Sequence, residues 1–284
     1  MSPDKLVAVL LLIAIMFHTG LQVDREHLFA VLKNYGLLAR AFLANFIIVP
    51  LLGVVVVRLF HLSEAIAIGV LLMAICPGVP FVVLSGGRKK GGSLGFAVSL
   101  AFLMPLVSIV TVPITARLVL PSDAQISANS LLVSLLGFQL VPLLLGIFAG
   151  DRAPALAERL RRPLAIVIGV LVLALLVLLG RPIGSAIVSV YGSRGMLAML
   201  CLVVLSLVTG WILGGRRREF RRTLGIGTAL RNIGLALVIS TAAFARTPTA
   251  AAVMTYLVIQ FAVVTLIGVF FTRTAEAPGA AASG

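Results

Sequence analysis

Nine long apolar stretches constrain the fold of this chain more than any other feature of its sequence. They run roughly over residues 5–22, 36–60, 64–85, 92–119, 127–150, 162–180, 194–214, 222–244 and 248–272. Each reaches the length of about 20 residues that a helix needs to cross the hydrocarbon core of a bilayer. Because lipid offers the backbone no hydrogen-bond partners, such stretches are expected to be helical. The sequence therefore predicts an all-α polytopic membrane protein with about nine transmembrane helices.

The charge balance agrees with a membrane protein and argues against other classes. Only 11% of the residues are charged, whereas soluble domains average about 25%. The net charge of +14 comes from short basic clusters between apolar stretches, such as residues 88–90 and 216–218. A nucleic-acid-binding protein would gather such residues on one domain or face. We therefore expect the lipid bilayer as a partner and no nucleic acid, and the sequence carries no signal about the oligomeric state.

The positions of lysine and arginine predict the orientation in the membrane. Sixteen of the 23 basic residues follow an odd-numbered stretch, six lie on the other side, and Arg231 lies inside a stretch. Basic residues favour the cytoplasmic side. We therefore expect a multi-pass protein of a bacterial-type inner (cytoplasmic) membrane, with the amino terminus outside and the carboxy terminus cytoplasmic. The first stretch lacks a small-x-small cleavage site, so we expect it to remain as a helix.

Two apolar stretches are interrupted at similar depth. The third contains Cys76-Pro77-Gly78-Val79-Pro80, whose prolines remove amide donors, and the eighth contains Arg231-Asn232-Ile233-Gly234. Matching breaks in two halves of a chain are typical of inverted-repeat transporters. The predicted organisation is one transporter domain over residues 1–272, with repeat one over about 5–119, an unpaired helix over about 127–150, repeat two over about 162–272, and a disordered cytoplasmic tail over 273–284.

Arg231 is the only charge deep inside an apolar stretch. All nine acidic residues lie in loops or at the ends of stretches, so none of them lies at a depth where it could neutralise Arg231. A charge at that depth is costly and indicates a function. One interpretation is a structural cation that caps carbonyls freed by a broken helix. The other, which we favour, is a fixed positive charge that binds or balances an anionic substrate, because the break in the third stretch should aim a half-helix amino terminus at the same point.

Few other residues suggest a site. His18 is the one histidine inside a stretch and is either a proton carrier or, more commonly for such residues, a structural hydrogen-bonding group. Gln139 and Gln260 are expected to bond between helices. No nucleophile, base and orienting group lie at one depth, so the chain is not expected to be an enzyme, and we expect no metal site. The candidate substrate-binding residues are His18, Asn45, Pro77, Gly78, Val79, Pro80, Arg231 and Asn232.

The segments MFHTGLQV, NFIIVPLL and GVLLMAICPG, followed later by LRNIGLAL, resemble the bile acid:sodium symporter family. The likeness in order and spacing covers roughly the first 120 residues and the eighth stretch. The resemblance implies a panel domain and a core domain, two broken helices that cross in the core, and transport of organic anions by alternating access. It also implies a nine-helix form of the fold.

The sodium ligands implied by this resemblance are largely missing. The family's first broken helix continues after Cys-Pro-Gly with small polar residues, whereas this chain has residues 79–83, Val-Pro-Phe-Val-Val. The family's glutamate and glutamine on the second broken helix correspond to Gly227 and Arg231. Only Asn45 and Asn232 keep a polar oxygen. Since a guanidinium repels a sodium ion, we expect Arg231 to replace bound sodium and to hold the broken helices together.

The sequence thus predicts a secondary active or facilitative transporter of a small organic anion that works by alternating access. Transport is expected to be sodium-independent, or proton-linked if His18 titrates. We expect no cofactor, and a sodium ion is not favoured. Two alternatives stay open: a sodium-coupled symporter of bile acids or other organic anions, and a membrane receptor or sensor that has the same fold but does not transport.

Overall fold

A computed structural model describes residues 2–23, 34–78, 92–121, 128–178, 194–244 and 247–276 of the 284-residue chain. Within these ranges the regular secondary structure is entirely helical. Eight helical stretches of the described residues are long and apolar enough to cross a membrane, and a shorter apolar helix occupies the start of the third apolar stretch. The predicted all-α polytopic membrane fold is therefore confirmed.

Each apolar stretch of the sequence corresponds to one helix or to two or three consecutive helical segments. In chain order these are α1 (Pro3–Gly20), α3 (Tyr35–Phe42) with η1 (Leu43–Ile48) and α4 (Val49–Phe60), α5 (Glu64–Ile75), α7 (Leu94–Val119), α8 (Ala128–Leu135) with η3 (Leu136–Leu140) and α9 (Val141–Arg152), α10 (Pro154–Leu178), α12 (Gly195–Leu213), α13 (Arg218–Ala229) with α14 (Ile233–Ala243), and α15 (Thr249–Glu276). The segments η1 and η3 are π-helical.

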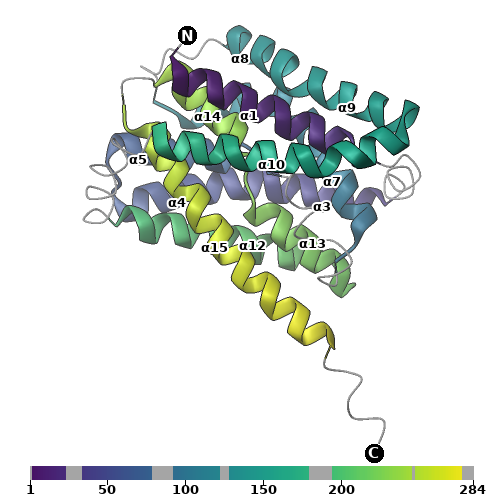
Figure 1. The fold of residues 1–284 in the computed structure, drawn as a ribbon. Coiled ribbons are helices and arrows are strands. Elements are labelled where there is room, and N and C mark those ends of the chain that lie inside the picture. Colours follow the sequence, from purple (N-terminus) through teal and green to yellow (C-terminus); the bar gives the residue numbers. More distant parts are fainter. Residues whose placement is uncertain are drawn as a thin grey trace, which may run out of the picture.

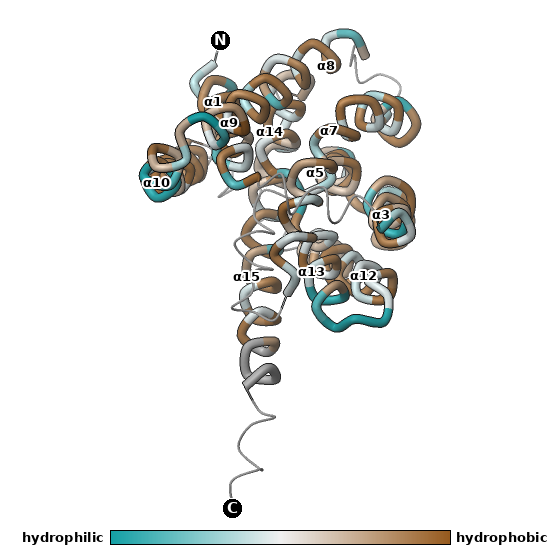
Figure 2. Tube along the Cα trace, turned by 90° about the vertical axis from the view of Figure 1, so that its right-hand side faces the viewer, coloured by the Kyte–Doolittle hydropathy of each residue, from teal (hydrophilic) through white to brown (hydrophobic). Residues whose placement is uncertain are grey.

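The helices form two groups that meet at α14. In one group α1 packs against α9 and α10, and in the other α12 packs against α4, α13 and α15, while α5 packs against α4 and α15. Helix α14 contacts both α1 and α15. Figure 2 shows α1, α9 and α10 gathered on one side of the molecule and α12 and α13 on the other. The two groups therefore share α14 as a common boundary.

The outer surface of the helices is apolar. On α10 the side chains of Val170, Leu173 and Val177 are 59%, 60% and 70% exposed, and hydrophobic colouring covers much of α10 and α3 in Figure 2. Exposed branched aliphatic side chains on this scale suit contact with lipid tails. The hydrophilic colouring gathers at ends of helices, such as the turn between α12 and α13.

Helix α1 is held closely against α9 by two glycines. A Cβ atom on Gly20 would lie 2.8 Å from Gly146 Cα, and one on Gly146 would lie 3.1 Å from Leu21 N. Small residues allow transmembrane helices to approach at backbone distance. Figure 1 shows α1 alongside α9 and α10 over most of its length, so these three helices form one closely packed unit.

Two predicted boundaries need correction. Helix α15 continues to Glu276, so the tail predicted over 273–284 begins at least four residues too early, and 277–284 lie outside the described residues. Helix α5 ends at Ile75, directly before the Cys-Pro-Gly sequence, because residue 77 lacks an N–H and cannot continue the helical pattern. The proposed division into repeats over 5–119 and 162–272 stays a prediction.

Candidate functional site

The first break leaves carbonyl groups without helical donors. In α5 the Met73 carbonyl would accept from the N–H of residue 77, but Pro77 has none. The Ala74 carbonyl would accept from Gly78, which lies beyond the end of the helix. Both oxygens are buried, and a buried carbonyl without a partner is costly. The end of α5 therefore needs donors from elsewhere in the molecule.

The second break also leaves backbone N–H and C=O groups without their helical partners. Helix α13 ends at Ala229, Leu230 is extended, and α14 begins at Ile233. The N–H of Arg231 donates to Gln260 Oε1 of α15 at 2.9 Å. The N–H of Asn232 donates to Cys76 O at 3.2 Å, so the Thr228 carbonyl loses its i+4 donor. The first break thus leaves carbonyl acceptors, and the second supplies N–H donors that can reach them.

The two breaks cross in direct backbone contact. A Cβ atom on Gly78 would overlap the carbonyl oxygen of Leu230 and would lie 2.7 Å from Arg231 Cα. Only glycine has no side chain at this distance. Together with the bond from Asn232 N–H to Cys76 O, this contact places Pro77, Gly78, Arg231 and Asn232 at one point. The structure thus shows the contact between the two breaks that the implied crossing requires, while the continuation of the first helix lies outside the described residues.

The Arg231 guanidinium caps the orphaned end of α5. Its Nε donates to Met73 O at 2.9 Å, and its Nη2 donates to Ala74 O. Its Nη1 donates to Asn45 Oδ1 at 2.9 Å and to Thr228 O at 3.4 Å. The side chain is 1% exposed. Arg231 therefore ties the ends of α5 and α13 to the π-helical segment η1.

Asn45 supplies a second acceptor because the backbone of η1 is widened. The N–H of Val49 donates to Ala44 O, five residues earlier, and Pro50 has no N–H, so the Asn45 carbonyl has no helical donor. Arg231 Nη2 donates to that carbonyl at 3.4 Å. π-Helical segments often occur at functional sites. The five N–H groups of the guanidinium are thus matched by five oxygens on four residues.

All five oxygens are neutral, and their positions explain how a charge is tolerated. Met73 O and Ala74 O lie at the carboxy end of α5, and Thr228 O lies at the carboxy end of α13. The carboxy end of a helix carries a partial negative charge that stabilises cations. No carboxylate contacts Arg231 in the described part of the chain. The positive charge of the Arg231 guanidinium is therefore stabilised by helix dipoles and neutral oxygens.

The second π-helical segment contacts the crossing from the opposite group of helices. Gln139 in η3 is buried and accepts from Asn232 Nδ2 at 3.4 Å. Its own Nε2 donates to Pro105 O and to Ser108 Oγ of α7, both at 2.8 Å. Asn232 Oδ1 accepts from the N–H of Leu235 at 3.1 Å and caps α14. The amino end of α14 therefore lies at the boundary between the helix groups.

Sequence reasoning placed Gln139 and Gln260 outside the site, yet both contact the crossing. One signal was available in the sequence. Asn45 and Gln139 each precede a Val-Pro-Leu-Leu sequence, and both lie in π-helical segments. A proline removes a donor from the preceding turn, so a polar residue before such a motif marks a widened helix. Gln260 carries no comparable local signal.

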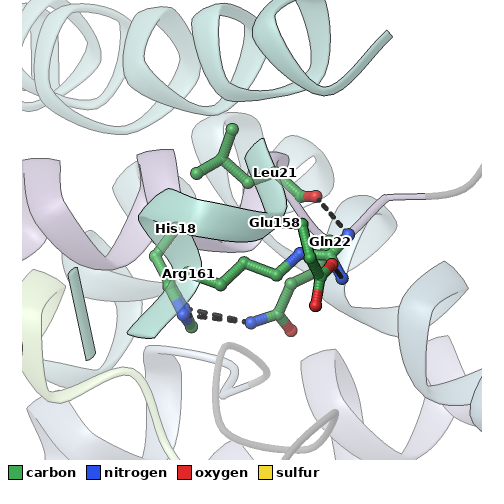
Figure 3. Close-up of polar contacts among 5 residues, drawn as sticks. All are labelled: His18, Leu21, Gln22, Glu158 and Arg161. Atoms are coloured by element: carbon green, nitrogen blue, oxygen red, sulfur yellow. Dashed lines mark hydrogen bonds and ion pairs between the residues drawn. The ribbon is translucent and has the colours of Figure 1, made fainter. Parts of the chain in front are cut away.

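His18 lies away from the crossing. The α1 residue beside Gly234 of α14 is Leu12, and His18 follows six residues later, about 9 Å further along the helix. Figure 3 shows His18 in a polar cluster with Gln22, whose Nε2 is 3.2 Å from a ring nitrogen. The prediction that His18 belongs with Arg231 in one site is therefore not supported by the geometry.

The same polar cluster joins the end of α1 to α10. Arg161 Nη2 donates to Leu21 O at 3.0 Å, and Arg161 Nη1 pairs with Glu158 Oε2 at 2.5 Å. An arginine at the carboxy end of a helix satisfies orphaned carbonyls there. Val79 and Pro80, the remaining predicted site residues, lie outside the described residues, as does the half-helix expected after the first break.

A sequence model described as the Sodium Bile acid symporter family matches residues 9–210. The match contains Asn45, Pro77, Gly78 and Gln139, whereas Arg231 lies beyond it. The comparison therefore includes one of the two breaks.

Curated proteins from a plant and a bacterium are also similar to the chain. It is 26% identical over 199 residues to the "Probable sodium/metabolite cotransporter BASS2, chloroplastic" of Oryza sativa subsp. japonica, covering 69% of this chain and 46% of that protein. It is 24% identical to the "Probable sodium/metabolite cotransporter BASS3, chloroplastic" of the same organism, covering 80% and 55%. It is 25% identical to the "Uncharacterized sodium-dependent transporter YocS" of Bacillus subtilis (strain 168), covering 81% and 72%. The chain spans about half the length of the two rice relatives.

Proposed function

Since the chain belongs to the sodium bile acid symporter family, we propose that it is a secondary transporter that carries a small organic anion by alternating access, with Arg231 in the place of bound sodium. The family is one of symporters by its description, which supports a transporter over an enzyme. The absence of an acidic residue deep in any apolar stretch supports a mechanism without a carboxylate proton relay.

The observation that carries this proposal is the set of oxygens around Arg231. Carbonyls from α5, α13 and η1 and the amide oxygen of Asn45 converge on the guanidinium. Neutral hard oxygens at two helix carboxy ends are also what an alkali cation prefers. In this chain the guanidinium of Arg231, a cation that belongs to the protein itself, donates hydrogen bonds to these oxygens. The ends of the broken helices are then held together without an ion from solution.

The substrate is proposed to bind beside Arg231 and not on its guanidinium. Three of the five N–H groups of that side chain have close protein acceptors, and the other two have carbonyl acceptors at 3.4 Å. The amino end of α14 is one residue away and carries the partial positive charge of a helix amino terminus. Asn232 Nδ2 points from that end toward Gln139. An anionic oxygen accepting from Asn232 would gain from both the helix dipole and the uncompensated charge of Arg231.

A sodium-coupled symporter is the second candidate function, because the names of the relatives describe sodium-dependent transporters. It would require sodium ligands elsewhere in the chain. A non-transporting receptor with the same fold is the third, and a proton-linked mechanism through His18 is a variant of the first. The three candidates differ in sodium dependence and in exchange, so counterflow combined with a thermal-shift measurement separates them.

The test is counterflow in proteoliposomes that contain the purified protein. Vesicles loaded with pyruvate, lactate, cholate or methanesulfonate are diluted into the same radiolabelled anion, with sodium in one series and choline in the other. We expect exchange of at least one anion at rates that agree within about twofold between the two cations. Strong sodium dependence would support the symporter. Anion-induced thermal stabilisation without exchange of any of the four would support the receptor.

The proposed orientation places the amino terminus outside and the carboxy terminus in the cytoplasm of a bacterial-type inner membrane. The excess of lysine and arginine after odd-numbered apolar stretches supports it. Fusions of alkaline phosphatase and of green fluorescent protein to the carboxy terminus test it in a bacterial host. We expect the fluorescent fusion to be active and the phosphatase fusion to be inactive, and the opposite pattern would reverse the orientation.

A further inference from the structure

We propose that Gln139 is a gate residue of the substrate site. In this conformation its side-chain oxygen accepts the hydrogen bond from Asn232 Nδ2, and an oxygen of the anionic substrate replaces Gln139 as the acceptor. This inference rests on the proposed transport function, because it assigns the substrate the position that Gln139 Oε1 now holds. It adds a specificity-determining residue from a helix that sequence reasoning treated as structural.

The lengths of the hydrogen bonds show which contact is suited to break. Gln139 Nε2 donates to Pro105 O and to Ser108 Oγ, both at 2.8 Å. The bond from Asn232 Nδ2 to Gln139 Oε1 is 3.4 Å long, near the outer limit for such bonds. Gln139 is therefore anchored firmly to α7 and holds Asn232 weakly, so the Asn232 bond is the one expected to open.

This bond lies at the boundary between the two groups of helices. Gln139 lies in η3, whose neighbouring helix α9 packs against α1, and Asn232 lies at the start of α14 in the crossing. Leu12 of α1 approaches the same end of α14, with its Cα 3.2 Å from a Cβ built on Gly234. A ligand that reaches the amino end of α14 from the boundary between the helix groups therefore has to part Asn232 from Gln139.

The chemistry favours an anion over the glutamine oxygen. Asn232 Oδ1 is already used by the N–H of Leu235, which fixes Nδ2 as the group that faces Gln139. A neutral amide oxygen accepts a weaker hydrogen bond than a carboxylate or sulfonate oxygen does. The amino end of α14 adds a preference for negative charge. An oxyanion is thus able to replace Gln139, whereas a neutral polar molecule offers no gain over the bond that it breaks.

The two π-helical segments play different parts at the crossing. Asn45 in η1 contacts Arg231 through its amide oxygen at 2.9 Å and lies in the same helix group. Gln139 in η3 contacts the next residue, Asn232, at 3.4 Å and comes from beside α9 in the other group. The short contact within one group suits a permanent role, and the long contact between groups suits an exchangeable one.

The cysteines of the chain provide an assay that needs neither substrate nor transport. Cys76 is fully buried at the crossing, where its carbonyl accepts from Asn232 N–H, and Cys201 lies on α12. Cys201→Ser leaves Cys76 as the single thiol, and Cys76→Ser leaves Cys201. The rate of modification by N-ethylmaleimide then reports opening at the crossing in the first protein and general loosening in the second.

Gln139→Met removes the amide while keeping a side chain of similar length. We expect it to speed the labelling of Cys76 at least about fivefold and to leave the labelling of Cys201 within twofold. Gln139→Ala should behave in the same way, so the test does not depend on one variant. Thr115→Ala is the control on α7: its hydroxyl donates to the carbonyls of Thr111 and Val112, so the change should alter neither rate by more than twofold.

Two outcomes would overturn the inference. An unchanged rate at Cys76 in both monodisperse Gln139 variants would mean that the bond to Asn232 gates nothing. Equal acceleration at Cys76 and Cys201 would mean that Gln139 only stabilises the fold. Because the labelling uses no anion, a failure of counterflow leaves this test intact, and normal counterflow with unchanged labelling would remove the gate alone.

Discussion

Replacing Arg231 with methionine tests whether the guanidinium holds the broken helices together. The change keeps an unbranched side chain but removes every donor that caps Met73 O, Ala74 O and the two oxygens of Asn45. Arg58→Met is the matched control, because Arg58 is exposed near the end of α4. Both variants are expressed and purified in the same detergent without sodium.

The size of the effect follows from the bonds that are lost. The two bonds to Met73 O and Asn45 Oδ1 are 2.9 Å long, and the bond to Ala74 O is also close. Leaving three buried acceptors without donors costs about 3–9 kcal/mol at 1–3 kcal/mol each. Removing the guanidinium also avoids its desolvation, which recovers about 1–4 kcal/mol. The net destabilisation is expected to be about 2–5 kcal/mol.

Thermal unfolding measures this difference. At about 2–4 °C per kcal/mol, the midpoint of Arg231→Met should fall by about 10 °C, and that of Arg58→Met should stay within about 1 °C. Arg231→Lys keeps the charge but has three donors instead of five, so its loss should be intermediate. If Arg231→Met unfolds at the temperature of the parent, the guanidinium does not hold the helices and the proposed sodium replacement fails.

The remaining predictions concern other contacts of the crossing. Gly78→Ala should destabilise the protein by about 3 kcal/mol or more, because the new methyl group overlaps a backbone carbonyl; a normal yield of monodisperse protein would contradict the crossing. Gln260→Leu leaves the backbone N–H of Arg231 without its acceptor and should lower stability by about 1–3 kcal/mol, measured as a thermal shift. Asn45→Leu removes one acceptor of Arg231 and should reduce stability more in sodium-free buffer than an apolar change on the lipid face, Val55→Leu. His18→Gln should keep counterflow within about twofold and unchanged in pH profile, because His18 lies away from the crossing; a loss of pH dependence would revive the proton-linked mechanism.

The sequence alone was sufficient for the membrane fold, the nine apolar stretches and the two breaks. These features depend on local properties: the length of an apolar run, the missing N–H of Pro77, and the cost of a charge such as Arg231 in lipid. The order of polar and apolar residues along one segment records all of them. For the same reason many helix ends fell within a few residues of their predicted positions, and the larger differences were the carboxy end of α5, at Ile75, and the amino end of α10, at Pro154.

Only the tertiary structure decided which groups at the crossing meet. The partners of Arg231 are mostly backbone oxygens, and every residue type has such an oxygen, so no sequence pattern names them. Gln139 is 93 residues from Asn232 in the chain and Gln260 is 29 residues from Arg231, so no local pattern pairs them. The sequence also did not show that His18 lies further along α1 than Leu12, the residue beside Gly234 of α14. The sequence showed that a buried cation needed oxygens, and the packing of α5, α13 and η1 determined which oxygens those are.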